Sequence, residues 1–301
     1  MQLLVYCLVY PTLWVISKLP WRLFYIFSTC VYLIVYYIIG YRKKTVTENL
    51  VLVFPEKDKK EIHRIRKAFY KHMCDMFLEM IKSISIKEEE MVDRFRLKNL
   101  DDLTKLEEKN KSIIIMMGHY TSYEWTNAID LITKFRCVGI YKPIKNKYFD
   151  RLVHRIRGRF GSGLIPSAKV FREIYSNQNK ENPDLNLYGL ISDQSPKLDR
   201  AMFWSDFMGI KVPAFMGGEV LAKRLDLSIY YFHVEKIKRG YYEATLVPIA
   251  EDPTNVPDYY ITEQFLRHLE TQIRNKPEYY LWTHKRWKHR FSTPPNGATI
   301  K

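Results

Sequence analysis

The sequence predicts an α/β fold, a mixed sheet flanked by helices, preceded by an N-terminal membrane-anchoring helix. Three observations support this: a long uncharged N-terminus, one strongly amphipathic helical segment, and an alternation of strand-like with helical segments. The 301 residues, 47% of them hydrophobic, are enough for one sizeable domain with a buried core.

The N-terminus is almost free of charge. Residues 1–16 and 23–41 contain no charged side chain, and only Lys18 and Arg22 interrupt the region between them. As a helix at about 1.5 Å per residue, residues 23–41 would be roughly 28 Å long, close to a hydrocarbon core of about 30 Å. Three basic residues, 42–44, follow directly. The positive-inside tendency therefore predicts that the rest of the chain lies on the cytoplasmic side.

Other interpretations of this region remain open. The first stretch is shorter and holds Pro11, which suits half of a hairpin or an interfacial helix. A cleaved signal peptide is disfavoured, because Met1-Gln2 supplies no positive charge and the apolar run continues far past a cleavage site. A buried pair of core helices would give the same pattern. We predict an anchor over residues 1–41, one catalytic domain over 42–292, and a flexible tail over 293–301.

Charge and cysteine content limit the class of partner. Lys and Arg number 48 against 33 Asp and Glu, a net charge of +15, which predicts an acidic partner such as nucleic acid, anionic lipid or an acidic carrier protein. The uncharged N-terminus and the 15% aromatic content favour a membrane surface over nucleic acid. The four cysteines have no C-x-x-C spacing, so we expect neither disulfides nor zinc, and a reducing compartment.

The body of the chain alternates between helical and strand-like patterns. Residues 58–85 have apolar side chains at intervals of three and four, with a basic opposite face that suits either solvent or lipid. Four later segments are rich in β-branched and aromatic residues and are predicted to be strands: 112–117, 136–141, 185–192 and 227–236.

One strand ends in a motif that can carry chemistry. Gly118-His119 follows the apolar run 113–117, and Glu124 lies five residues after the histidine. In a regular helix these side chains would point about 140° apart, but they can meet if His119 lies in a strand-to-helix turn. Gly118 permits such a turn, and Thr121 or Ser122 can cap the following helix.

In that geometry Glu124 would hold the imidazole of His119 in one tautomer, and the other ring nitrogen could take a proton from a hydroxyl group. The alternative, which is favoured for an isolated histidine, is that His119 is a hydrogen-bonded side chain at the end of a strand with no catalytic role. A zinc site is disfavoured, because the spacing is not H-E-x-x-H and no third ligand is evident.

Further short motifs accompany this one over nearly the whole chain. They are Gly40-Tyr41-Arg42-Lys43, Glu48-Asn49-Leu50 with Phe54-Pro55, Tyr141-Lys142-Pro143, Arg157-Gly158-Arg159, Asp193-Gln194 and the segment 280–286. Together they resemble the lysophospholipid acyltransferase superfamily, and within it the late (lauroyl/myristoyl-type) acyltransferases of lipid A biosynthesis, which carry an H-x4-D/E motif. The chain departs from relatives at 121–123, where they often have Gly-Asn-Trp; this bears on acceptor preference.

The resemblance implies a set of site residues. The catalytic histidine falls on His119 and its acidic partner on Glu124. Arg157 matches an arginine that lines the site, with Arg159 as the alternative, and Asp193 matches an acidic residue of the same pocket. An arginine can bind a phosphate bidentately, and Asp193 can orient the arginine or a sugar hydroxyl. Without the resemblance, ordinary surface ion pairs would explain these residues.

The resemblance also implies the reaction. A fatty acyl chain would pass directly from an acyl carrier protein thioester to a hydroxyl of a lipid A precursor, without a metal or organic cofactor. The enzyme would lie in the cell inner membrane with its catalytic domain on the cytoplasmic side. The basic stretch 284–290 suits lipid phosphates or the acidic carrier protein.

Several alternatives stay open. Acyl-CoA could be the donor, and another amphiphile, such as an amino-acid lipid, a glycolipid or a pigment ester, the acceptor. A lipid hydrolase could use the same histidine with water or Ser122 as nucleophile. A non-catalytic membrane-bound binding protein would explain the charge and the anchor, but not the placement of His119.

Overall fold

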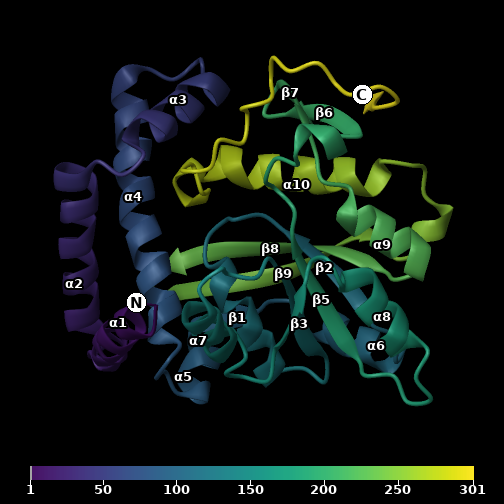
Figure 1. The fold of residues 1–301 in the computed structure, drawn as a ribbon, viewed down its shortest axis with the longest axis horizontal. Helices are drawn as coiled ribbons and strands as arrows, with labels where there is room; N and C mark the ends of the chain where they lie inside the picture. The colour runs from purple at the N-terminus through teal and green to yellow at the C-terminus, as the bar shows by residue number, and fades with distance from the viewer. Residues whose placement is uncertain (1) are drawn as a thin grey trace.

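A seven-stranded sheet forms the centre of the computed structural model, which describes residues 2–301 (Figure 1). All neighbouring strands run parallel except the hairpin β8–β9. The mixed α/β fold is therefore confirmed. In sheet order the strands are β1 (Phe95–Leu97), β9 (Tyr241–Ala250), β8 (Ile229–Lys238), β2 (Ile113–Met117), β5 (Asn186–Ile191), β3 (Arg136–Tyr141) and β4 (Gly163–Pro166).

The four predicted strands are all present. Strand β3 has the predicted bounds, and β2, β5 and β8 differ from prediction by one or two residues at an end. Successive residues of β2 point to opposite faces of the sheet, so Ile113 and Ile115 lie in one hydrophobic cluster and Ile114 and Met116 in the other. Both faces of the sheet are thus covered, as expected for a parallel sheet.

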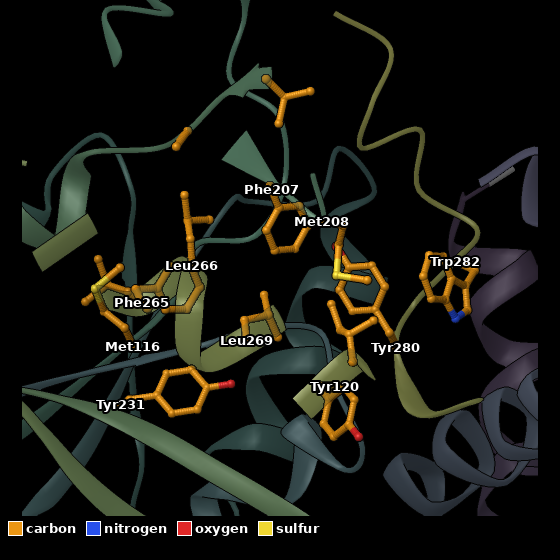
Figure 2. Close-up of a cluster of buried hydrophobic side chains, with 14 of the residues drawn as sticks. Met116, Tyr120, Phe207, Met208, Tyr231, Phe265, Leu266, Leu269, Tyr280 and Trp282 are labelled. Atoms are coloured by element: carbon orange, nitrogen blue, oxygen red, sulfur yellow. The ribbon is translucent and has the colours of Figure 1, made fainter. Parts of the chain in front are cut away.

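Helices cover the two faces. One face packs against α8 (Val170–Gln178), α9 (Gly217–Leu225) and α10 (Tyr260–Asn275); the other packs against α5 (Glu88–Arg94), α6 (Leu100–Glu108) and the 3-10 helix η2 (Tyr123–Leu131). Figure 2 shows the α10 side, where Phe265, Leu266 and Leu269 lie among Met116 of β2 and Tyr231 of β8. Gly218 of α9 leaves room for Met116, whose sulfur would be 2.7 Å from a Cβ at that position.

The predicted amphipathic helix is α4 (Lys59–Lys82), and most of its apolar face is buried as expected, while Phe77 is 41% exposed. Asp58 caps it by accepting a hydrogen bond from the backbone N–H of Glu61. At the N-terminus α1 (Gln2–Lys18), α2 (Trp21–Leu33), the π-helix η1 (Ile34–Ile39) and α3 (Lys43–Val53) precede it, and Figure 1 shows α2 alongside α4. Residues 21–39 form a helix long and apolar enough to cross a membrane.

The last residues are attached to the body. Strand β10 (Thr299–Ile300) pairs in parallel with β6 (Phe203–Phe207), which pairs with β7 (Ile210–Pro213) in a second, three-stranded sheet. The backbone N–H groups of Thr299 and Lys301 bond to carbonyls of the segment around β6. The flexibility of the tail over 293–301 stays a prediction.

Candidate active site

The site lies at the carboxyl ends of β2 and β5. His119 follows β2 by two residues, in a segment that bridges to the C-terminal part of the chain: Thr121 N–H bonds to the carbonyl of Tyr279, and Leu281 N–H to that of His119. A Cβ at Gly118 would lie 2.6 Å from Leu269 Cδ1, so a larger residue there would force this leucine side chain to shift. The left-handed residue of the turn is Thr121, with φ of 49°.

His119 is paired with Asp193. Because Met117 is in register with Ile191 on the adjacent parallel strand, the residues two positions further along each strand come side by side. The Nδ1–H of His119 donates to Asp193 Oδ1 at 2.6 Å, and the Asp193 side chain is only 3% exposed. This bond leaves Nε2 as the ring nitrogen that can accept a proton.

The pair shifts the pKa of both groups. Burial alone would lower the pKa of His119, but the charge of Asp193 and its hydrogen bond outweigh burial and raise that pKa above its usual value. Burial would raise the pKa of Asp193, and the opposing effect of His119 lowers it below its usual range. Asp193 is therefore ionised at neutral pH and stabilises the protonated imidazole.

Glu124 does not hold His119. Both of its oxygens accept hydrogen bonds from Arg157, from Nε at 3.0 Å and from Nη2 at 2.7 Å. The expected contact between Glu124 and the imidazole is therefore corrected: Asp193 takes that place, and Glu124 binds the arginine that Asp193 was expected to orient. The charge of Glu124 still reaches His119 and contributes to raising its pKa.

The local backbone differs from the expected capped α-helix. Residues 123–131 form the 3-10 helix η2, and Ser122 at its N-cap makes no side-chain capping bond. The Thr121 hydroxyl instead donates to the carbonyl of Val234. Neither residue expected to cap a helix does so.

The structure separates the two candidate arginines. Arg157 is the last residue of α7 (Lys147–Arg157) and faces Glu124. Burial would lower the pKa of Arg157, but the carboxylate of Glu124 has the larger effect and raises that pKa above its usual value. Arg159 is exposed and donates to the backbone carbonyls of Ile84 and Ile86. Of the two, Arg157 lies next to the pair formed by His119 and Asp193.

Three more side chains lie around the pair. The side-chain nitrogen of Gln194 is 3.4 Å from Nε2 of His119. Nε2 of His284 accepts from the backbone N–H of Ser195, and burial lowers the pKa of His284 to about 4, so it is neutral at neutral pH. Arg286 is 1% exposed, and its charge and that of Asp193 interact.

Sequence reasoning placed His284 and Arg286 in a surface patch over 284–290. Arg286 and Trp287 are buried, so neither of them belongs to an exposed patch. The presence of His284 and Arg286 in the motif 280–286 was the available signal, but nothing in the spacing showed that this segment reaches the end of β5.

An apolar cavity of about 90 Å³ opens beside the pair. Tyr123, Glu124 and Arg157 lie at one side of it, and the ring of Tyr123 contacts that of His119 edge-on at 5.0 Å between centroids. The cavity extends over the sheet, where glycines from three neighbouring strands line it: Gly139, Gly163 and Gly189. Within residues 2–301 no group of three or more His, Cys, Asp or Glu side chains is placed to hold a metal ion.

A half-buried histidine paired with a buried aspartate beside an apolar cavity, on an α/β sheet, is typical of an enzyme that moves a proton next to an apolar substrate. Residues 1–289 match the family model described as bacterial lipid A biosynthesis acyltransferase. The chain belongs to this family and is an O-acyltransferase, which confirms the resemblance. A comparison with curated protein sequences gave no match.

Proposed function

We propose that the enzyme transfers a fatty acyl chain from an acyl carrier protein thioester to a hydroxyl of a lipid A precursor, with His119 as general base. The observation that supports this most is the bond between His119 Nδ1 and Asp193 next to the apolar cavity. It fixes the tautomer in which Nε2 can accept the hydroxyl proton.

The reaction follows from this geometry. Nε2 of His119 takes the proton as the acceptor oxygen attacks the thioester carbonyl, forming a C–O bond and a tetrahedral intermediate. The intermediate then breaks its C–S bond, and the imidazolium returns the proton to the carrier thiolate. Asp193 stabilises the imidazolium between these steps. The amide of Gln194, close to the same nitrogen, is positioned to hydrogen-bond a reacting oxygen.

Glu124 and Arg157 would bind and position substrate. Glu124 is bonded to Nε and Nη2 of Arg157, which leaves Nη1 for a phosphate of the acceptor or of the donor's carrier arm. The arginine side chain is 30% exposed, so a ligand can reach it. The carboxylate therefore acts through the arginine as a positioning residue.

The cavity would hold the donor acyl chain. Apolar side chains from one face of the sheet and the ring of Tyr123 line it, and Gly139, Gly163 and Gly189 leave space where a side chain would otherwise fill it. A thioester at His119 would direct its chain past Tyr123 over these glycines.

In this proposal residues 1–41 attach the acyltransferase domain, residues 42–292, to the cytoplasmic side of the inner membrane. The exposed basic residues Lys285, Lys288 and Arg290 line a separate surface cavity with α3. They are available for lipid phosphates or for the acidic carrier protein.

The test is a transfer assay with purified enzyme, acylated carrier protein and a lipid A precursor, followed by mass spectrometry of the product. We expect the acceptor to gain one acyl chain, and lipid A from cells lacking the gene to miss the same chain. Transfer from acyl-CoA alone would change the donor, and release of free fatty acid without acceptor would favour a hydrolase.

A glycine in the cavity should set acyl length. A Cβ at Gly189 would lie 3.9 Å from Ile115 and Met117, so Gly189→Leu can project into the cavity without a backbone clash. We expect this variant to prefer shorter chains and to lose roughly fourfold in kcat/KM for each methylene displaced, since burying one is worth about 0.8 kcal/mol. Competition between carrier proteins loaded with different chains measures this. Gly217→Leu, outside the cavity and with no atom near its Cβ, is the matched control.

The two arginines should differ in effect. Arg157→Lys loses the fork bound to Glu124, and we expect a fall of roughly tenfold or more in kcat/KM, about one charged hydrogen bond. Arg159→Lys should stay within about twofold, because Arg159 is exposed and its guanidinium donates to the backbone carbonyls of Ile84 and Ile86. Equal losses in the two variants would remove the substrate-binding role from Arg157.

A further inference from the structure

The outer face of α2 and η1 is apolar and exposed. Large exposed side chains recur on it at spacings of three, four and seven residues: Leu23, Ile26, Leu33, Ile34, Tyr37 and Ile38. Ile26 is 61% exposed and Ile38 79%. A contiguous stripe of this kind on a helix needs an apolar partner.

The inner face of α2 is docked on α4 by buried polar contacts. Ser28 donates to Asp75 at 2.6 Å, and Tyr25 donates to Glu79 at 2.8 Å. Arg239, from the turn after β8, bonds to Asp75 and to the carbonyl of Tyr25. Asp75 and Glu79 are 1% and 0% exposed. Helix α2 therefore completes the burial of two carboxylates of the body and is part of the folded domain.

Both ends of this helix contact the body. At the start, the indole N–H of Trp21 donates to Glu90, and the guanidinium of Arg94 lies 3.7 Å from the centre of its ring. At the end, Tyr36 accepts from Arg66 and contacts Tyr70. Helix α1 also lies against the body, next to α7 (Figure 1). The ring of Tyr6 contacts those of Tyr148 and Phe149 of α7.

This arrangement is incompatible with a crossing helix. If α2 crossed the bilayer, one of its ends would lie roughly 30 Å from the side that holds the body. Helix α4 would be drawn into the hydrocarbon with it, together with the exposed Lys71 halfway along α4.

The basic residues at both ends of the helix formed by α2 and η1 also argue against a crossing. Lys18 and Arg22 flank the start of α2, and Arg42 to Lys44 follow its continuation, with Lys44 89% exposed in its side chain. A crossing helix concentrates basic residues at its cytoplasmic end, whereas here both ends are basic. Both ends therefore match the anionic headgroups of one membrane surface.

We propose that the N-terminal helices attach to one face of the membrane without crossing it. The outer face of α2 lies in the acyl region of a single leaflet, its basic ends lie among the headgroups, and the N-terminus stays on the side of the catalytic body. This rests on the membrane location proposed above, and it replaces the single crossing that length and composition suggested.

The test is the side of each chain end. The full-length enzyme carries one epitope tag at its N-terminus and another at its C-terminus, and protease is added to sealed inner-membrane vesicles of each orientation. We expect both tags to be removed in the same vesicles. Removal of the two tags in vesicles of opposite orientation would overturn the proposal. Acyl transfer is assayed in the same vesicles, so a wrong topology in an active enzyme is distinguished from a wrong function.

A pair of substitutions tests the stripe itself. Ile26→Glu with Ile38→Glu should move most of the enzyme to the soluble fraction at high salt, while transfer to detergent-dispersed acceptor persists, since the docked face of α2 is unchanged. Phe171→Glu with Tyr175→Glu, on an exposed apolar pair of α8, should leave the enzyme on membranes. Equal retention of both variants on membranes would contradict the role of the stripe.

Discussion

Replacing His119 with alanine should lower the rate of acyl transfer about 10²- to 10⁴-fold, the usual contribution of a general base. In the proposed mechanism the imidazole takes the acceptor proton, and the hydrogen bond to Asp193 holds the ring in the tautomer that this requires. Single-turnover transfer from a labelled carrier protein measures the loss. The variant should fold, because the backbone bonds of this turn, from Leu281 N–H to the His119 carbonyl and from Thr121 N–H to the Tyr279 carbonyl, do not use the imidazole.

His284→Ala is the matched control for that experiment. His284 is a second histidine near Asp193, and its low pKa keeps it neutral. If the base is His119, this variant should lose much less activity. An active His119→Ala enzyme would remove the base from the mechanism.

Asp193→Asn should be the next largest loss, on the order of 10²-fold or more in kcat. If the asparagine amide donates to Nδ1, the ring proton lies on Nε2, where the reaction needs a free lone pair. If its oxygen accepts from Nδ1–H instead, it still lacks the charge that stabilises the imidazolium. The double variant with His119→Ala should be little slower than His119→Ala alone, because the two side chains act as one unit. Additive losses would instead give Asp193 a separate task.

The same comparison separates Asp193 from Glu124. Glu124→Gln keeps the shape of its side chain and the bond between His119 and Asp193, so its main effect should appear in KM through Arg157. An effect of Glu124→Gln on kcat as large as that of Asp193→Asn would return the orienting role to Glu124.

Much of the fold could be predicted from local pattern. The strands β2, β3, β5 and β8 are runs rich in apolar residues, which are buried on one or both faces of the sheet. Helix α4 has the spacing of an amphipathic helix, and Asp58 caps it. Strand β9 was missed although buried and half-buried residues alternate along most of it, because Glu243 and Pro248 interrupt its apolar pattern. Short strands such as β10 gain their stability from pairing, which no local pattern reveals.

The histidine could be predicted from its own segment. Its contact with Asp193 could not, although the resemblance placed Asp193 in the same pocket. His119 ends a strongly apolar strand, a signal visible in the sequence. That Asp193 lies beside it depends on β2 and β5 being neighbours in register, and the chain separates these strands by more than 60 residues. Spacing along the chain favoured Glu124, but the 3-10 helix that follows the turn carries its carboxylate to Arg157.

The dependence of kcat/KM on pH, in the wild-type enzyme and in Asp193→Asn, tests the central claim most directly. The base must be unprotonated in the free enzyme, so activity rises with pH through the pKa of His119. Asp193 raises that pKa, and the acid limb of the wild-type profile should have its midpoint above about 6.5. Removing the carboxylate removes this effect, and the midpoint in Asp193→Asn should move to lower pH. A midpoint that stays in place, or moves to higher pH, would contradict a base at His119 held by Asp193.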